Sequence, residues 1–201
     1  MTVERFIKDS ILAGVAIALG CTVYLCSVNK IVGAFLFSVG LMVVCSRKLL
    51  LYTGYIPYVS NLNMFLRALI IWLGNCLGVV ITAIVVYLAK PDLSIIADQA
   101  ATIKIDKGLC VIPLGILCNV LIYLAVDGFK HSKHEVGKYL VLVLCVMTFI
   151  ICGFEHCIAN TFYLALGGKL LTVTGLGYII LNTFGNTLGG IIIYRLSKYN
   201  S

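Results

Sequence analysis

Gly74-Asn75-Cys76-Leu77-Gly78 returns 111 residues later as Gly185-Asn186-Thr187-Leu188-Gly189, each time in the last apolar segment of one half of the chain. Glycines four residues apart let two helices approach closely, and the asparagine offers an amide to unpaired backbone groups. The recurrence predicts that the two halves, at about 11–89 and 109–196, share one structure. If each half holds three spanning helices, the second is inverted relative to the first, as in many channels and transporters.

The composition is typical of a membrane protein. Of the 201 residues, 61% are hydrophobic and only 11% are charged, which is too little polar surface to cover a soluble globule. The net charge of +7 is scattered over the loops, so we expect lipid contacts and no nucleic-acid partner. The nine cysteines lie mostly in apolar segments and form no CxxC motif, which favours small buried hydrophobic residues. We expect one membrane domain over residues 1–201, with no cofactor.

The lengths of the apolar runs predict six spans, two of them broken. A helix needs ~20 residues to cross the ~30 Å hydrocarbon core. The second and fifth runs have 15 and 14 residues, or roughly 21 to 23 Å of helix. The six runs are Ile11–Val28, Ile31–Cys45, Leu69–Ala89, Leu109–Val126, Tyr139–Cys152 and Leu171–Leu196, with a shorter run at Ile158–Leu166. The longest polar segment, Lys90–Lys107, reads as a loop between the halves.

Two interruptions lie at corresponding places in the halves. Tyr52–Tyr58 contains Pro57, which has no N–H and disfavours helix at the residue before it. In the second half, Cys152–His156 precedes the half-span Cys157–Leu166. Non-helical backbone at membrane depth is tolerated only where protein or a water-filled cavity satisfies its polar groups. The paired breaks therefore indicate a pore.

The basic residues predict the orientation. Met1–Ser10 has mixed charge and no small-x-small cleavage site follows, so the first run is expected to remain as a span. Six spans then place both termini on one side, which carries ten of the fifteen Lys and Arg residues and is expected to be cytoplasmic. The ten are Arg5, Lys8, Arg47, Lys48, Arg67, Lys130, Lys133, Lys138, Arg195 and Lys198, and the other five are Lys30, Lys90, Lys104, Lys107 and Lys169.

Glu155 and His156 form the only acid and histidine pair between apolar runs. Ionisable groups inside a membrane are costly and usually functional, so His156 is a candidate to hydrogen-bond or protonate a passing ligand, or to fix the broken backbone. Glu155 either serves the ligand path or holds neighbouring backbone N–H groups. The half-helices after the breaks are expected to present unpaired N–H groups and partial positive charge, which favours an anion.

Three asparagines and two further histidines are weaker candidates. Asn75 and Asn186 are expected to support the breaks structurally, whereas Asn119 faces either the lumen or the broken segments. His131 and His134 lie in the polar stretch Asp127–Lys138 without the further ligands that a metal site needs, so we expect no metal there.

The string Gly153-Phe154-Glu155-His156-Cys157-Ile158-Ala159-Asn160-Thr161-Phe162 closely resembles the signature of the formate/nitrite transporter family of pentameric, aquaporin-like anion channels. Leu51-Tyr52-Thr53-Gly54, Gly115-Ile116-Leu117-Cys118-Asn119 and the two Gly-Asn-x-x-Gly strings resemble other parts of that family in the same order. The resemblance implies an all-α membrane protein with six helices in two inverted repeats, assembled as a homopentamer in the plasma membrane. It also implies passage of formate, nitrite, hydrosulfide or similar monovalent anions, often with a proton.

The resemblance also implies roles for individual residues. His156 resembles the central pore histidine, Thr53 the threonine that faces it, and Asn119 a nearby asparagine. Lys104 resembles the lysine of the outer vestibule. The two hydrophobic slits around the histidine match Phe37, Leu41, Leu51 and Phe149.

The chain departs from the family pattern in places. Leu50 stands where an acid is usual, just after Arg47 and Lys48, and Asp127 replaces a usual tryptophan. About ten residues precede the first span, so gating by a long N-terminal helix is not expected.

Two other classes were weighed against the anion channel. A water or glycerol channel shares the inverted fold, but its two Asn-Pro-Ala strings are absent because none of the three prolines follows an asparagine. An intramembrane enzyme needs a nucleophile with a base or a clustered metal site. Glu155 and His156 have no serine or aspartate partner at a recognisable spacing, so we expect no enzyme.

Overall fold

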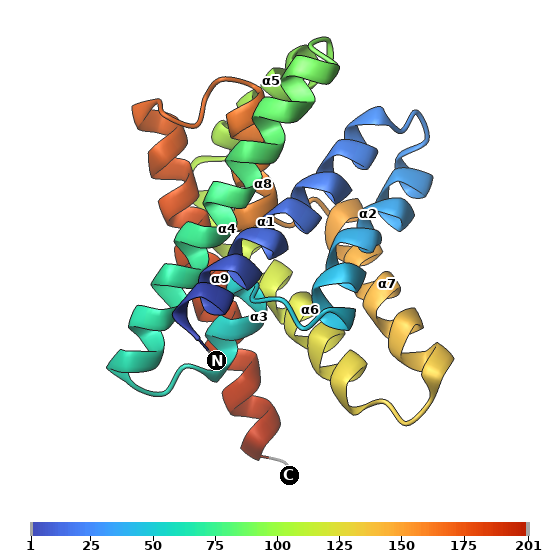
Figure 1. The fold of residues 1–201 in the computed structure, drawn as a ribbon, viewed down its shortest axis with the longest axis vertical. Coiled ribbons are helices and arrows are strands. Elements are labelled where there is room, and N and C mark those ends of the chain that lie inside the picture. Colours follow the sequence, from blue (N-terminus) through green and yellow to red (C-terminus); the bar gives the residue numbers. More distant parts are fainter. Residues whose placement is uncertain (1, 200–201) are drawn as a thin grey trace.

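The computed structural model describes residues 2–199 as a bundle of helices without strands (Figure 1). The first half contains α1 (Val3–Cys26), α2 (Lys30–Ser46), α3 (Tyr52–Tyr55), the 3-10 turn η1 (Ile56–Tyr58) and α4 (Leu62–Ala89). The second half contains α6 (Val111–His131), α7 (Glu135–Ile151), α8 (Cys157–Leu166) and α9 (Val173–Tyr199), and α5 (Leu93–Ile105) with η2 (Gly108–Cys110) joins the halves.

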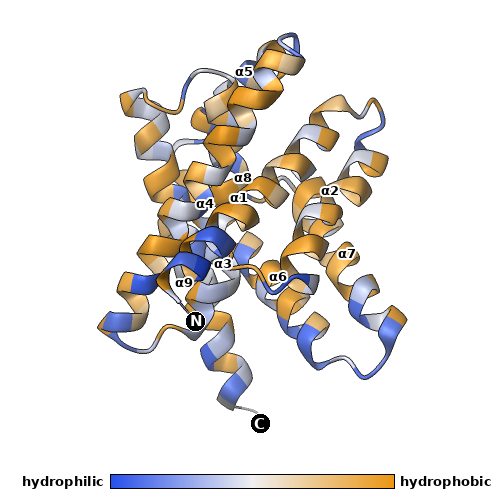
Figure 2. Ribbon diagram, in the orientation of Figure 1, coloured by the Kyte–Doolittle hydropathy of each residue, from blue (hydrophilic) through white to orange (hydrophobic). Residues whose placement is uncertain are grey.

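Four helices are long and apolar enough to cross a membrane. They are α1, α4, α6 with the preceding η2, and α9 up to Lys198. Hydrophobic residues dominate the middle of the bundle, and hydrophilic residues gather at its two ends (Figure 2). Large apolar side chains such as Leu73, Val85 and Ile180 are 58–65% exposed on the outer surface, as expected of a lipid-facing wall.

The predicted breaks in the second and fifth spans are confirmed. α2 ends at Ser46 after 17 residues, and the chain becomes helical again only at Tyr52 in α3. α7 likewise ends at Ile151 after 17 residues, and α8 begins at Cys157 as the sequence predicts. Neither segment is a continuous spanning helix.

The two halves pack their helices in the same way, but corresponding helices run in opposite directions. α1 packs against α4 and α2, and α6 packs correspondingly against α9 and α7. In Figure 1, α1 runs from the end marked N toward the α1–α2 turn at the other end, whereas α6 runs back toward the end marked N. The opposite directions agree with the predicted inversion of the repeat.

Three segments predicted to be non-helical are largely helical. Tyr52–Tyr58 forms α3 and η1, so the first break lies before it, at residues 47–51. Lys90–Lys107 contains the 13-residue helix α5, because Leu93, Ala97 and Ala101 recur every four residues and form one buried face. The two alanines of this face let α5 pack closely on α8. The stretch Asp127–Lys138 is also mostly helical, since α6 extends to His131 and α7 begins at Glu135.

Close helix approach depends on the glycines of the repeated string. A Cβ added at Gly78 would overlap the carbonyl oxygen of Ile11 on α1, and one at Gly189 would overlap the carbonyl oxygen of Ile116 on α6. Gly14 on α1 likewise leaves room for the backbone of Asn75. The contacts α1–α4 and α6–α9 therefore require glycine at these positions.

We predict that Gly78→Ala lowers the unfolding midpoint of the detergent-solubilised protein, because α1 and α4 must move apart. Overpacking of this kind costs about 1–3 kcal/mol. Gly177→Ala on α9 is the matched control, since a Cβ there meets nothing within 4 Å. It should leave the midpoint unchanged or raise it, because alanine favours helix over glycine. A loss of stability in both variants would show that the close approach is not the cause.

Candidate functional site

Both breaks begin with the same turn, at an offset of 105 residues. Gly153 N–H donates to Ile150 O at 3.1 Å and Phe154 N–H to Phe149 O at 2.9 Å. In the first half, Lys48 N–H donates to Cys45 O at 3.2 Å and Leu49 N–H to Val44 O at 2.9 Å. The turn needs a residue with positive φ, and this residue is Gly153 (φ 67) in one half and Lys48 (φ 55) in the other.

After each turn, the side chain of one asparagine holds the chain in place. Asn75 Oδ1 accepts from Tyr52 N–H at 2.8 Å, and its Nδ2 donates to Ser10 O at 2.7 Å and Leu50 O at 2.8 Å. Asn186 Oδ1 accepts from Cys157 N–H at 2.9 Å, and its Nδ2 donates to Gly115 O and Glu155 O, both at 2.8 Å. Each amide thus joins three helical segments, and both asparagines are fully buried.

Three N–H groups at the two helix starts are occupied within the protein. At the first turn of α8, Cys157 N–H is bound by Asn186 and Ala159 N–H by His156 Nδ1 at 3.2 Å. In α3, Asn75 occupies Tyr52 N–H. These three donors are satisfied inside the protein, so they are not available to bind an anion.

His156 connects the two broken spans. Its Nε2 lies 3.0 Å from Thr53 Oγ1, although the residues are 103 positions apart. Because Nδ1 accepts the N–H of Ala159, the ring hydrogen is assigned to Nε2, which donates to Thr53. The Thr53 hydroxyl then keeps its own hydrogen for another acceptor. Both side chains are almost completely buried.

Apolar side chains surround this pair. The Phe149 ring stacks against His156 with 6.0 Å between centroids, and Phe37 meets Phe149 edge-on at 5.9 Å. Leu51 directly precedes the α3 turn that carries Thr53, and Leu41 lies on α2. All four predicted slit residues are at most 3% exposed. The hydrogen bond therefore lies in an apolar constriction.

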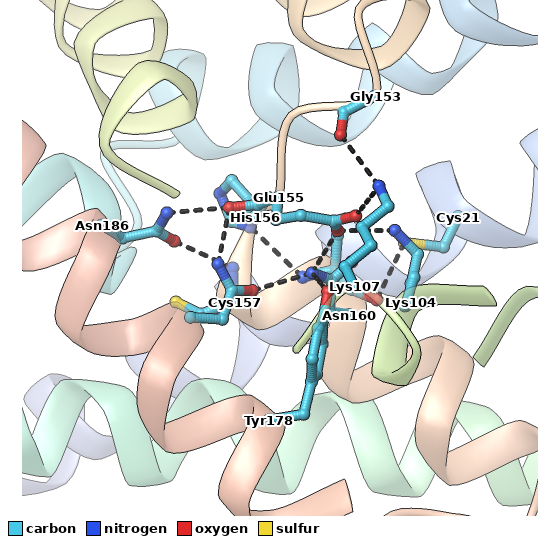
Figure 3. A network of polar contacts seen from close by, with 12 residues as sticks. Cys21, Lys104, Lys107, Gly153, Glu155, His156, Cys157, Asn160, Tyr178 and Asn186 are labelled. Carbon is cyan, nitrogen blue, oxygen red and sulfur yellow. Dashed lines mark hydrogen bonds and ion pairs between the residues drawn. The ribbon is translucent and has the colours of Figure 1, made fainter. Parts of the chain in front are cut away.

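Glu155 is the centre of a charged cluster beside the histidine (Figure 3). Its carboxylate lies between two lysines: Lys104 Nζ is 2.7 Å from Oε2, and Lys107 Nζ contacts Oε1. Asn160 Nδ2 lies 2.7 Å from Oε2, and Asn182 Nδ2 donates to the Glu155 carbonyl at 2.7 Å. Because the carboxylate is fully buried, this pairing is what makes its charge tolerable.

Two cavities lie on opposite sides of the constriction. The first, which we call the outer vestibule, holds about 230 Å³ and is lined by His156, Phe37, Phe149, Lys104 and Lys107, among others. The second, the inner vestibule, holds about 510 Å³ and is lined by Leu51, Lys48 and Lys130, among others. Neither lining contains a carboxylate residue. The two spaces and the constriction between them resemble a path through the protomer.

Several groups of the site were not singled out from the sequence. Lys107 pairs with Glu155 as Lys104 does, and the signal was its position three residues after Lys104. Asn160, Asn182 and Tyr178 join the cluster, with Asn160 Nδ2 at 2.7 Å from Asn182 Oδ1 and 2.9 Å from Tyr178 OH. Asn160 belonged to the quoted signature but carried no predicted role.

Asn119 is buried beside the breaks, but its amide is tied to α9. Its Nδ2 donates to Asn186 O at 2.7 Å, and its Oδ1 has no partner within residues 2–199. His131 and His134 lie outside the site: His131 Nδ1 is 3.2 Å from Asp127 on the surface, and His134 is exposed at the start of α7. Over the described part of the chain, no three His, Cys, Asp or Glu residues are grouped as metal ligands.

Comparison with known proteins gives concordant matches. The family model described as formate/nitrite transporter matches residues 1–200. The formate channel FocA of Haemophilus influenzae is 25% identical over 154 residues, 69% of this chain and 54% of that protein, so the match spans about half the length of that relative. The nitrite transporter NirC of Salmonella typhimurium is 27% identical over 193 residues, 86% of this chain and 71% of NirC.

Solved structures match over nearly the whole chain. A chain described as an FNT family ion channel superposes with a TM-score of 0.88 at 25% identity, covering 97% of this chain and 89% of the other. A pentameric formate channel with formate bound gives a TM-score of 0.86 at 21% identity, covering 98% of this chain and 96% of the other. The second likeness supports the fold.

Proposed function

Because the chain belongs to the formate/nitrite transporter family, we propose that it is a channel that passes small monovalent anions, formate first and nitrite or hydrosulfide as alternatives. The relatives described as formate channels and nitrite transporters support this class of substrate. The protein is a multi-pass membrane protein, with four spanning helices and two broken spans.

The observation that carries the proposal is the buried hydrogen bond between Thr53 and His156. It lies where both broken spans meet, between two cavities and inside an apolar constriction. Apolar residues would pack in this place at least as well, because burying polar groups costs free energy that their mutual hydrogen bond only offsets. A passing ligand explains why the pair is there.

The proposed mechanism follows from this order of groups. Lys104 and Lys107 outnumber Glu155 by one charge, so the outer vestibule attracts an anion. Phe37, Leu41, Leu51 and Phe149 then strip water from it, and desolvation raises the proton affinity of any acid anion. At the narrowest point the Thr53 hydroxyl donates to the anion while His156 Nε2–H supports Thr53. The anion takes up a proton that comes from the water on its entry side, so it crosses as the neutral weak acid and one proton moves with each anion.

We assign supporting roles to the neighbouring polar side chains. Asn75 and Asn186 keep the breaks in shape, and Glu155 anchors the second break to α5. The unpaired Oδ1 of Asn119 is assigned to the lumen, where it can accept from water or a protonated substrate.

The proposal extends to assembly and orientation. We assign a single domain over residues 1–201, a homopentamer with one pore per protomer, and a place in the plasma membrane. The solved relative described as pentameric supports the assembly. Both described ends lie at the same end of the bundle, and the ten basic residues predicted on that side favour the cytoplasm.

A flux assay with the purified protein in liposomes tests the function. Labelled formate and nitrite should equilibrate faster than in protein-free vesicles, whereas glycerol should not. Family membership does not favour the alternative of an aquaporin-like channel for neutral solutes. Rapid glycerol passage without formate or nitrite passage would replace the anion channel with that alternative.

Thr53→Val should slow formate uptake about fivefold, because it removes the hydroxyl that His156 supports while keeping the side-chain shape. The factor corresponds to ~1 kcal/mol for one neutral hydrogen bond. Thr53→Ser retains the hydroxyl and is the matched control, with uptake expected near that of the parent. Equal rates for the valine and serine variants would remove Thr53 from the mechanism.

A further inference from the structure

The two vestibules are related by the repeat but differ in charge. Glu155, which neutralises one of the two outer lysines, corresponds at an offset of 105 residues to Leu50. The inner vestibule is lined by Leu50 together with Lys48 and Lys130. Each lining contains two lysines and no acid, but the two outer lysines are paired with Glu155 behind them, whereas no corresponding carboxylate pairs with the inner two within residues 2–199.

Neither inner lysine is paired with a carboxylate within residues 2–199, and both are exposed. Lys130 Nζ lies 4.8 Å above the Tyr58 ring, which orders the side chain without neutralising it. The acid nearest to Lys130 in sequence is Asp127, one turn earlier on α6, where it contacts His131. Asp127 also acts electrostatically on Tyr58, so it lowers the positive potential near Lys130, but it forms an ion pair with neither inner lysine.

The backbone at Lys48 supplies a second, independent observation. Its φ of 55° makes it the only non-glycine residue with positive φ in the described chain. The corresponding turn of the second half has Gly153, the residue type that this conformation favours. A lysine is strained there, and strain of this kind is characteristic of functional positions.

We propose that Lys48 and Lys130 form an anion-binding site at the inner mouth of the pore, which loads small carboxylates and oxyanions from the side of the termini. The inference rests on the proposed anion transport. It extends that proposal by placing a site that binds anions more tightly on the side of the termini. Lys48 is retained in a strained conformation because its ammonium group raises the local anion concentration.

Lys48→Gly removes the charge and relieves the strain together, so anion binding should weaken while the stability of the protein rises. In vesicles captured through an N-terminal tag, at low protein density, the half-saturating formate concentration from the terminus side should rise about threefold, the effect of one unit charge at roughly 7 Å in water. The double variant Lys48→Gly/Lys130→Gln should show about a tenfold rise. Values from the opposite side should not change, and the differences should shrink in high salt.

Two controls isolate the charge. Lys48→Arg keeps both charge and strain and should behave as the parent. Lys133→Gln removes an exposed lysine at the same end that lines neither vestibule, and should also leave the half-saturating concentration unchanged. Equal half-saturation of the parent and the double variant at low ionic strength, or an equal change from both sides, would overturn the proposal.

A thermal measurement in detergent tests the site without transport. Lys48→Gly should raise the unfolding midpoint by about 2–4 °C through relief of the strain. At low ionic strength, formate should raise the midpoint of the parent more than that of the double variant, because a bound anion stabilises the folded state. Equal formate shifts would refute the site. If the parent transports neither formate nor nitrite but the shifts differ, the proposed function fails while the site stands.

Discussion

Asn186→Leu is expected to abolish the folded protein or to lower its free energy of unfolding by about 3–6 kcal/mol. The substitution leaves Cys157 N–H and Gly115 O without their side-chain partner and weakens the pairing of Glu155 O. Each buried polar group left unpaired costs about 1–3 kcal/mol. Asn182 also donates to the Glu155 carbonyl, so that group loses one of two bonds.

The repeat provides a parallel and a control. Asn75→Leu should have a similar effect, because Asn75 makes the corresponding three bonds in the first half. Asn63→Leu, on the exposed start of α4, removes an asparagine without a buried partner and should change stability by less than ~0.5 kcal/mol. Size-exclusion profiles and unfolding midpoints in detergent measure all three. Wild-type midpoints for Asn75→Leu and Asn186→Leu would exclude the proposed support of the breaks.

His156→Asn is expected to assemble normally and to lose the pH dependence of formate uptake. Asparagine is a good N-cap residue, so it can accept Ala159 N–H in place of His156 Nδ1 and keep the start of α8. It removes the ring N–H that reaches Thr53 and leaves a wider, more polar opening. In the parent, uptake should rise as external pH falls, by up to about tenfold per pH unit, because each anion that crosses the constriction needs one proton from the external side.

His156→Leu removes both the capping role and the pore role, so its comparison with His156→Asn separates the two. Leucine can neither cap α8 nor donate to Thr53, so this variant should also be less stable by about 1 kcal/mol. The initial rate of labelled formate uptake as a function of external pH distinguishes the variants. An asparagine variant that folds, assembles and keeps the parental profile would leave His156 with the capping role alone.

The breaks were predictable because they follow from physical limits that act locally. An apolar run of 14 or 15 residues is too short for the bilayer. Pro57 did not mark the first break, because it lies in η1, after the break at residues 47–51. The role of Asn75 and Asn186 was predictable because a buried amide beside a broken helix has unpaired backbone groups to bind. By contrast, the pairing of Thr53 with His156 was expected only from the family resemblance, since no local pattern relates residues 103 positions apart.

The repeat also has two offsets, which the strings alone do not reveal. The asparagine strings recur after 111 residues, but the turns recur after 105. Tyr52 lies 23 residues before Asn75, whereas Cys157 lies 29 residues before Asn186, so the second half has six extra residues after its break. The alignment of Lys48 with Gly153, and of Leu50 with Glu155, becomes visible only when the hydrogen bonds are known.

The charged cluster was missed because α5 was predicted to be a loop. The segment Lys90–Lys107 contains three acids and three lysines, which indicated a polar loop. The pattern of Leu93, Ala97 and Ala101 was too weakly hydrophobic to indicate a buried face. Once α5 is a helix packed on α8, Lys104 reaches Glu155 and Lys107 follows just beyond its end. Small residues that permit close packing carry little hydropathy signal.

The most direct test of the pore is a simultaneous measurement of labelled formate uptake and internal pH in liposomes that contain either the parent or His156→Asn. For the parent, we expect formate uptake and internal acidification to rise together as external pH falls, because the anion crosses the Thr53–His156 constriction with a proton. For the variant, we expect formate to enter with little acidification. Identical coupling of proton and formate in the two proteins, at equal assembly, would contradict the account.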